Sequence, residues 1–102
     1  MINITKDNFK QEVLESPIPV LVDFYADWCG PCKMLAPVLE QVEAQVGDSV
    51  KVVKINTDDA QSLAMQYSIS TIPTLILFKN GEETNRHSGF MNKNDVISFI
   101  EK

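Results

Sequence analysis

The fold is decided by residues 20–32, which read Val20-Leu21-Val22-Asp23-Phe24-Tyr25-Ala26-Asp27-Trp28-Cys29-Gly30-Pro31-Cys32. The run from Val20 to Ala26 is apolar except at Asp23, which is typical of a central strand covered by helices on both faces. Both cysteines follow where this run meets a helix-like run. Because two sulfurs three positions apart at the first turn of a helix are near neighbours, the pair is predicted to close and reopen as a disulfide.

The two cysteines are predicted to have different roles. A cysteine at the very start of a helix faces unpaired backbone N–H groups and the positive end of the helix dipole, and both favour the thiolate. Cys29 is therefore the expected nucleophile. Cys32 lies almost one turn further in and is the expected resolving thiol. Pro31 suits a first helical turn and Gly30 leaves room beside the sulfurs, so the two residues form a rigid, uncrowded spacer.

The alternative interpretations of the cysteine pair are a structural disulfide and half of a metal site. Zinc needs four ligands, whereas the chain offers two thiols and one distant His87, to which we assign no role. In a reducing cytoplasm a disulfide is more often transient and catalytic than structural. A redox pair is therefore the favoured interpretation.

Asp23 is a candidate proton acceptor. A carboxylate inside an apolar strand loses hydration, which raises its pKa toward neutrality unless a cation or hydrogen bonds compensate. Because its strand ends at the thiols, Asp23 can accept the proton of Cys32 directly or through a water. Lys54 stands in a later apolar run and is expected to modulate the pKa of Asp23 from a neighbouring strand. The alternatives are a structural buried acid and an ordinary snorkelling lysine.

Two further residues bear on substrate docking. Trp28 is an aromatic beside the reactive sulfur and suits a docking surface, although a large aromatic at a strand end is as often part of the core. Pro73 stands at the entry to a strand predicted from Thr74 to Phe78. A proline at such a place must lie at an edge or a terminus, in the trans or the cis form.

Composition and charge limit the kind of protein. A chain of 102 residues with 44% hydrophobic content is expected to form one domain, residues 1–102, around one compact core. The N-terminus lacks a basic region followed by an apolar one, and no long apolar run is present, so we expect a soluble, cytoplasmic protein without a membrane segment. A formal net charge of -5 disfavours nucleic acid and anionic membranes as partners. We expect a monomer.

Hydrophobic spacing predicts the other elements. Asp7 is expected to cap a first helix, Gly47 to end the helix that follows the thiols, and Asn92 to cap a last helix. Asn80-Gly81 is a two-residue hairpin signal, so the strand after it is antiparallel. Strands are predicted at residues 2–4, 20–26, 50–55 and 74–78, and after the hairpin. The order βαβαβαββα defines an α/β fold with a central mixed sheet between helices, and sites in such sheets lie beyond the carboxyl ends of strands.

Together these residues closely resemble the thioredoxin family over essentially the whole chain. The matching segments are Asp23 to Lys33, Pro37, Lys54, Ile72-Pro73-Thr74, Phe78 to Glu82, and Gly89. The resemblance implies a thioredoxin fold, with Cys29 as nucleophile, Cys32 as resolving thiol, and Asp23 with Lys54 as the buried proton-handling pair. It also implies a cis peptide before Pro73.

The resemblance further implies what the protein binds and does. The backbone of Ile72 would pair with an extended client chain, at the centre of an apolar docking surface. Gly-Pro between the cysteines is typical of family members that act as reductants, which implies a protein-disulfide reductase. A separate thioredoxin reductase, drawing on NADPH or ferredoxin, would restore the dithiol, and no bound cofactor is needed. The expected docking residues are Trp28, Gly30, Pro31, Ile72, Pro73 and Gly89.

Two departures from the family pattern flank the expected docking surface. Ser70-Thr71 precedes Ile72 where small and basic residues are common, and Ser88 stands where an apolar residue is usual. These departures leave the chemistry intact and bear on the choice of partner. Three rival functions are an oxidase or isomerase, a binding module that uses the same surface without its thiols, and a metal or iron–sulfur site shared across a dimer.

Overall fold

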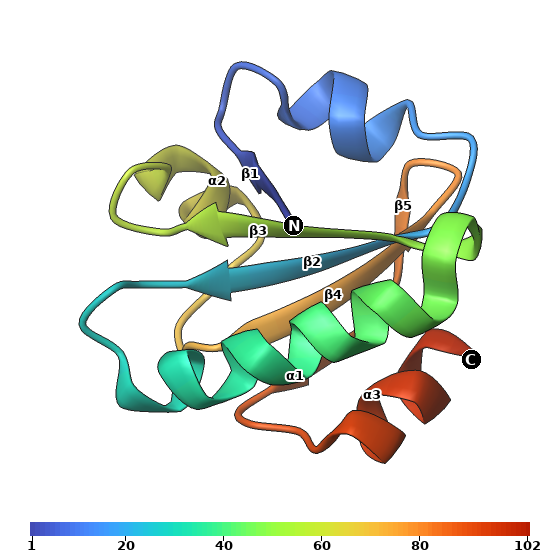
Figure 1. The fold of residues 1–102 in the computed structure, drawn as a ribbon. Coiled ribbons are helices and arrows are strands. Elements are labelled where there is room, and N and C mark those ends of the chain that lie inside the picture. The colour runs from blue at the N-terminus through green and yellow to red at the C-terminus, as the bar shows by residue number, and fades with distance from the viewer.

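The computed structural model describes residues 1–102. Its strands are β1 (Ile2–Ile4), β2 (Val20–Tyr25), β3 (Lys51–Asn56), β4 (Thr74–Lys79) and β5 (Glu82–Ser88). Its helices are η1 (a π-helix, Lys10–Leu14), α1 (Gly30–Val46), η2 (a 3-10 turn, Gly47–Ser49), α2 (Gln61–Gln66) and α3 (Lys93–Ile100). The predicted order of strands and helices is confirmed, with η1 in the place of the first helix (Figure 1).

One five-stranded sheet, in the order β1-β3-β2-β4-β5, forms the centre of the molecule. β3 runs parallel to both β1 and β2, whereas β4 is antiparallel to β2 and β5 is antiparallel to β4, so the predicted mixed sheet is confirmed. Because β2 and β3 are parallel, their carboxyl ends lie at the same edge of the sheet, on the left in Figure 1. The loops that follow these two strands therefore lie close together.

Helices cover both faces of the sheet, as predicted, because side chains alternate along each strand. On one face, Val22 and Phe24 of β2 belong to a buried apolar cluster with residues of η1 and α2. On the other face, Leu21 of β2 belongs to a second cluster with residues of α1 and α3, and Figure 1 shows these two helices together on one side of the sheet. The sheet is thus buried on both faces, which explains the nearly unbroken apolar sequence of β2.

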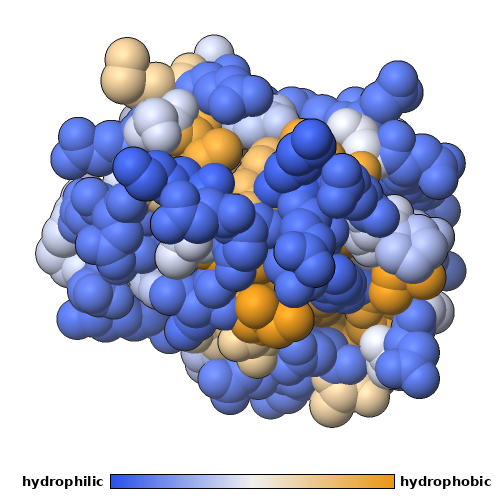
Figure 2. Space-filling model, turned by 90° about the horizontal axis from the view of Figure 1, so that it is seen from above, coloured by the Kyte–Doolittle hydropathy of each residue, from blue (hydrophilic) through white to orange (hydrophobic).

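The face of the molecule that is seen from above is mainly hydrophilic (Figure 2). Figure 2, which looks down on the molecule from above the view of Figure 1, shows isolated apolar groups among polar ones. The large hydrophobic side chains that are exposed are Ile2, Trp28, Met34, Met65 and Phe90. No helix combines the length and the apolar composition that crossing a lipid bilayer requires.

The start of the first helix differs from the prediction. Asp7 does not cap it: the backbone N–H of Asp7 donates to the Thr5 hydroxyl, and the Asn8 side chain accepts from the Thr5 N–H. The carbonyl of Thr5 accepts from the N–H groups of Asn8 and Phe9, so Asp7 lies inside this turn and not before it. Phe9 and Val13 of this segment are buried against the sheet, and Leu14 is partly buried. Capping by Asp7 was wrong because the first carbonyl to accept backbone hydrogen bonds here is that of Thr5, two residues before Asp7.

The hairpin between β4 and β5 forms as predicted. Asn80 and Gly81 both have positive φ, 54° and 81°, as a two-residue turn that continues the strand twist requires. The turn also packs against the first helical segment, because a Cβ added at Gly81 would lie 2.8 Å from the carbonyl oxygen of Leu14. Gly81 is therefore needed both for its backbone conformation and for this close approach.

Candidate active site

The cysteine pair lies at the first turn of α1, just beyond the carboxyl end of β2. Cys29 and Cys32 form a disulfide, with their Cα atoms 5.2 Å apart. Cys29 is the N-cap of α1, and Pro31 occupies the first turn, as the sequence predicted. Gly30 has open space beside its Cα, since an added Cβ would meet no atom within 4 Å. The spacer is therefore uncrowded on its outer side.

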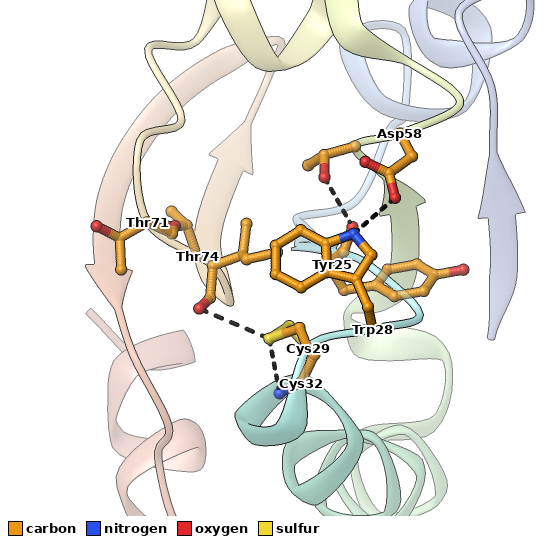
Figure 3. The surroundings of a disulfide bond; sticks show 9 residues. Tyr25, Trp28, Cys29, Cys32, Asp58, Thr71 and Thr74 are labelled. Atoms are coloured by element: carbon orange, nitrogen blue, oxygen red, sulfur yellow. Dashed lines mark hydrogen bonds between the residues drawn. A yellow bond between two sulfur atoms is a disulfide. The ribbon is translucent and has the colours of Figure 1, made fainter.

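The two sulfurs have different surroundings (Figure 3). The backbone N–H of Cys32 donates to Cys29 Sγ over 3.2 Å, so the sulfur of Cys29 acts as the acceptor at the helix N-terminus. The same sulfur lies 3.8 Å from the carbonyl oxygen of Ile72. Cys32, by contrast, lines a cavity of about 210 Å³ together with Tyr25 and Lys54. Cys29 thus lies between the helix end and the segment before Pro73, whereas Cys32 adjoins a cavity that is open to solvent on one side.

Asp23 is buried on the face of β2 that α1 covers. It is 3% exposed, and its Oδ1 atom has no hydrogen-bond partner. It points to the same side of the sheet as Leu21, which packs with buried residues of α1. Burial raises the pKa of the Asp23 carboxyl from 3.8 to about 7, and the positive charge of Lys54 acts in the opposite direction. The raised pKa that the sequence predicted is confirmed.

Lys54 lies beside Asp23 on the neighbouring strand. The two residues are register partners in the parallel pair of β2 and β3, which confirms the predicted proximity. Lys54 is half-buried, and its Nζ lies 5.5 Å from the centre of the Tyr25 ring. The salt bridges of the molecule involve other residues, so no ion pair joins Lys54 to Asp23. The lysine therefore acts on Asp23 as a nearby charge and not as a hydrogen-bond donor.

Trp28 is a surface residue. Its side chain is 71% exposed, so the interpretation of this residue as part of the core was wrong. Its Nε1 donates to Asp58 Oδ2 over 2.9 Å, which holds the indole beside the disulfide (Figure 3). Sequence reasoning missed Asp58. The available signal was its position just after β3, because parallel neighbouring strands bring their following loops to one edge.

The segment around Pro73 forms the other side of the site. The Ile72–Pro73 peptide bond is cis, as the family resemblance implied, and Pro73 is buried while Ile72 is partly exposed. The Gly89 N–H donates to the carbonyl oxygen of Pro73 over 2.7 Å. Gly89 has a φ of 102°, a conformation that favours glycine. The structure therefore brings Cys29, Ile72, Pro73 and Gly89 into one region.

His87, the one histidine weighed as a metal ligand, does not lie beside the cysteine pair in the strand order of the sheet but in its edge strand. His87 is in β5 and pairs with Leu75 of β4. The chain holds no group of three or more His, Cys, Asp or Glu side chains that could bind a metal ion. The residues that the sequence connected with the thiols, Asp23, Trp28, Lys54, Ile72 and Pro73, lie instead on β2, on β3 and in the loops beside the disulfide.

A disulfide at the N-terminus of a helix, on a mixed sheet and against a cis-prolyl segment, defines a thiol–disulfide oxidoreductase. The family model "Thioredoxin" matches residues 1–102. The chain is 47% identical to the thioredoxin of Rickettsia felis over 100 residues, 98% of this chain and 95% of that protein. It is 52% identical to thioredoxin 1 of Synechococcus elongatus over 99 residues, 97% of this chain and 92% of that protein. The chain belongs to the thioredoxin family, and its fold is the thioredoxin fold.

Family and site together define the activity. The protein is a protein-disulfide reductase whose cysteine pair is a redox-active disulfide. Thioredoxins work without a bound cofactor, exchange disulfides with target proteins and are reduced again by a reductase. The structure describes the oxidised form, in which Cys29 and Cys32 are joined.

Proposed function

We propose that Cys29 is the nucleophile and Cys32 the resolving thiol in the reduction of client disulfides. One observation carries this assignment: the backbone N–H of Cys32 donates to Cys29 Sγ at the N-cap of α1. A helix N-terminus and an N–H donor both stabilise negative charge on that sulfur. Cys32 has no such donor and lies one turn further into α1, beside the cavity that Lys54 also lines, which suits a thiol that attacks second.

The proposed reaction has two exchange steps. In the first, the Cys29 thiolate attacks one sulfur of a client disulfide, which forms a mixed disulfide and releases the other client sulfur as a thiolate. In the second, Cys32 loses its proton and attacks Cys29 Sγ, which breaks the mixed disulfide and releases the remaining client sulfur. Two electrons pass to the client, and the Cys29–Cys32 disulfide is left behind.

Asp23 is the proposed acceptor of the Cys32 proton. Its carboxylate lies on the side of the sheet that α1 covers, and its pKa of about 7 allows it to gain and lose a proton near neutral pH. Lys54 lowers the pKa of Asp23 and lines the cavity that Cys32 also lines. We therefore assign Lys54 the role of modulating Asp23 and not that of touching the client.

The proposed docking surface surrounds Cys29. Exposure of the Trp28 indole supports apolar contact with a client, and the partial exposure of Ile72 supports strand-like backbone pairing with an extended client segment. Gly30 and Pro31 lie exposed at the first turn of α1 and leave room for an approaching chain. The proposed docking residues are Trp28, Gly30, Pro31, Ile72, Pro73 and Gly89.

The setting of the reaction completes the proposal. Electrons come from a thioredoxin reductase that draws on NADPH or ferredoxin, and the protein works as a single-domain monomer of residues 1–102 in the cytoplasm. The reducing character of that compartment and the Gly-Pro spacer support the reductant direction. The acidic net charge of -5 supports clients that are proteins and not nucleic acids.

The test is reduction of a disulfide-bonded protein substrate by a small dithiol, with the protein present in catalytic amounts. We expect strong acceleration that Cys29→Ser abolishes. Cys32→Ser is the matched variant: it retains the nucleophile, so a mixed disulfide with the substrate should accumulate and be released by excess dithiol. If both variants still bind the substrate equally and the parent gives no acceleration, the thiols are not the working groups and a binding module is the correct interpretation.

A further inference from the structure

The buried hydroxyl of Thr74 joins two segments of the site. Thr74 begins β4, directly after the cis-prolyl segment, and is 1% exposed. Its Oγ1 contacts the carbonyl oxygen of Thr71 on one side and lies 3.0 Å from Ser88 Oγ on the other. Ser88 ends β5 and is the register partner of Thr74. A side-chain link therefore runs from the end of β5 to the loop that carries Ile72.

The direction of the hydrogen bonds along this link follows from the number of protons. A hydroxyl has one proton to donate, whereas the Thr71 carbonyl can only accept. Thr74 therefore donates to Thr71, and Ser88 must donate to Thr74. A hydroxyl that accepts one hydrogen bond becomes a better donor in the next, so the Ser88 bond strengthens the bond to Thr71.

A backbone bond completes the connection between the same two segments. The Gly89 N–H, one residue beyond Ser88, donates to the carbonyl oxygen of Pro73 over 2.7 Å. Two hydrogen bonds thus join residues 71–74 to residues 88–89, one at the carbonyl of Pro73 and one at the hydroxyl of Thr74. Between these points lies Ile72, whose carbonyl oxygen is 3.8 Å from Cys29 Sγ.

We propose that Ser88 is a positioning residue for client docking, acting through Thr74 to fix the backbone of Ile72 beside Cys29. This inference rests on the proposed pairing of a client with Ile72. Ser88 is itself exposed and lies in an edge strand, so it contributes little to the core. Its hydroxyl restricts the docking segment, and a restricted segment binds an extended client with a smaller loss of conformational freedom. This role gives a structural reason for a serine at the position where the family resemblance implies an apolar residue.

The experiment compares a protein disulfide with a small one. In Ser88→Ala, the KM for a disulfide-bonded protein substrate should rise about fivefold, the size expected for one neutral hydrogen bond, with kcat unchanged. Reduction of a small disulfide such as 2-hydroxyethyl disulfide should keep the parent rate, because no extended chain docks. Ser88→Thr retains the hydroxyl and should restore the parent KM. Thr84→Val is the matched control, because Thr84 lies in the same strand and its hydroxyl donates to the Leu77 carbonyl, away from this link.

A double substitution tests whether Ser88 acts through Thr74. Thr74→Val removes the shared hydroxyl and should raise the KM for the protein substrate at least as much as Ser88→Ala does. Adding Ser88→Ala to Thr74→Val should then give no further rise, whereas independent effects would multiply. An unchanged KM in Ser88→Ala, or multiplying effects, would overturn the positioning role while leaving Cys29 chemistry intact. If the parent protein itself did not accelerate the reduction of the protein substrate over the dithiol alone, that result would instead overturn the proposed function.

Discussion

Asp23 and Lys54 are register partners on β2 and β3, yet no salt bridge joins them. The ammonium of Lys54 lies over the Tyr25 ring, with Nζ 5.5 Å from the ring centre. Asp23 is left with a buried oxygen that has no hydrogen-bond partner, and its desolvation outweighs the attraction of the lysine. The protein therefore holds a carboxyl that loses its proton near neutral pH, at a stability cost that depends on pH.

The first prediction concerns that cost. The pKa of Asp23 is 3.8 in its ordinary setting and about 7 in the folded protein, so the folded state holds the proton over this range while the unfolded chain releases it. The ionised carboxylate is therefore destabilising. The penalty is absent below pH 3.8, grows as the pH rises from 3.8 to about 7, and is complete above about pH 7. Its full size is about 4 kcal/mol, at about 1.4 kcal/mol for each pH unit of the rise.

Asp23→Asn should remove this penalty. Urea denaturation of the oxidised protein measures the difference in unfolding free energy between variant and parent at about pH 4 and about pH 8.5. The variant should gain up to about 4 kcal/mol at the higher pH relative to the lower. Any cost of burying the amide is the same at both values and cancels. A difference that does not change with pH would mean that Asp23 is ionised in the folded protein throughout.

The second prediction concerns Lys54. Its positive charge lowers the pKa of Asp23, so Lys54→Met should raise that pKa above about 7, as followed by the carboxyl carbon resonance of Asp23 in a titration. The pH at which the rate of client release from the mixed disulfide reaches half of its maximum should then shift upward as well. Lys51→Met is the matched control, because Lys51 lies in the same strand but its Nζ binds Glu12. An equal effect of both substitutions would show that net charge, and not the position of Lys54, controls Asp23.

The third prediction concerns the hydrogen bond between Trp28 and Asp58. Asp58→Ala removes the acceptor of the indole N–H, so the side chain should gain mobility while the fold is retained, because both residues are exposed. Trp28 is the one tryptophan of the chain, so its fluorescence anisotropy reports this change directly. The KM for a protein disulfide should rise about two- to fivefold, the size expected for one lost hydrogen bond. Unchanged anisotropy would mean that packing against its neighbours, and not Asp58, holds the indole.

The sequence was sufficient for those features that depend on local pattern. The apolar run of β2, the Asn80-Gly81 turn and the Asn92 cap, whose side chain accepts from the Asp95 N–H, are each read from a few adjacent residues. The position of Cys29 at the helix start is of the same kind.

Contacts between distant segments could not be read in this way. The bond from Trp28 to Asp58 and the link from Ser88 to Thr74 join residues 30 and 14 positions apart, and they depend on strand register. The ammonium of Lys54 lies over the Tyr25 ring and not against Asp23, and the side-chain rotamer that decides between these positions depends on the folded surroundings. Even the local Asp7 cap was wrong, because Thr5 and Asn8 form an alternative hydrogen-bonded turn.

The last prediction separates two reasons for a glycine. Gly47 ends α1 with φ 57° and ψ −127°, and Gly81 lies in the hairpin with φ 81°, so both have the positive φ that favours glycine. A Cβ at Gly47 would meet nothing within 4 Å, whereas one at Gly81 would lie 2.8 Å from the Leu14 carbonyl oxygen. Gly47→Ala should therefore cost only the backbone strain of this sparsely populated conformation, about 1 to 3 kcal/mol. Gly81→Ala should cost about 2 to 4 kcal/mol, because overpacking is added to the strain.

Urea denaturation of the oxidised variants measures both costs. Reductase activity at low temperature should be retained in Gly81→Ala, because the hairpin lies at the end of the sheet opposite to the disulfide: Phe78 pairs with Val20, whereas Thr74 pairs with Phe24 near Cys29. A loss of only about 1 to 2 kcal/mol in Gly81→Ala, the size of the backbone strain alone, would mean that the hairpin moves away from Leu14 at little cost. A larger loss in Gly81→Ala would establish that the turn is held against the first helical segment, so the sheet and that segment unfold together.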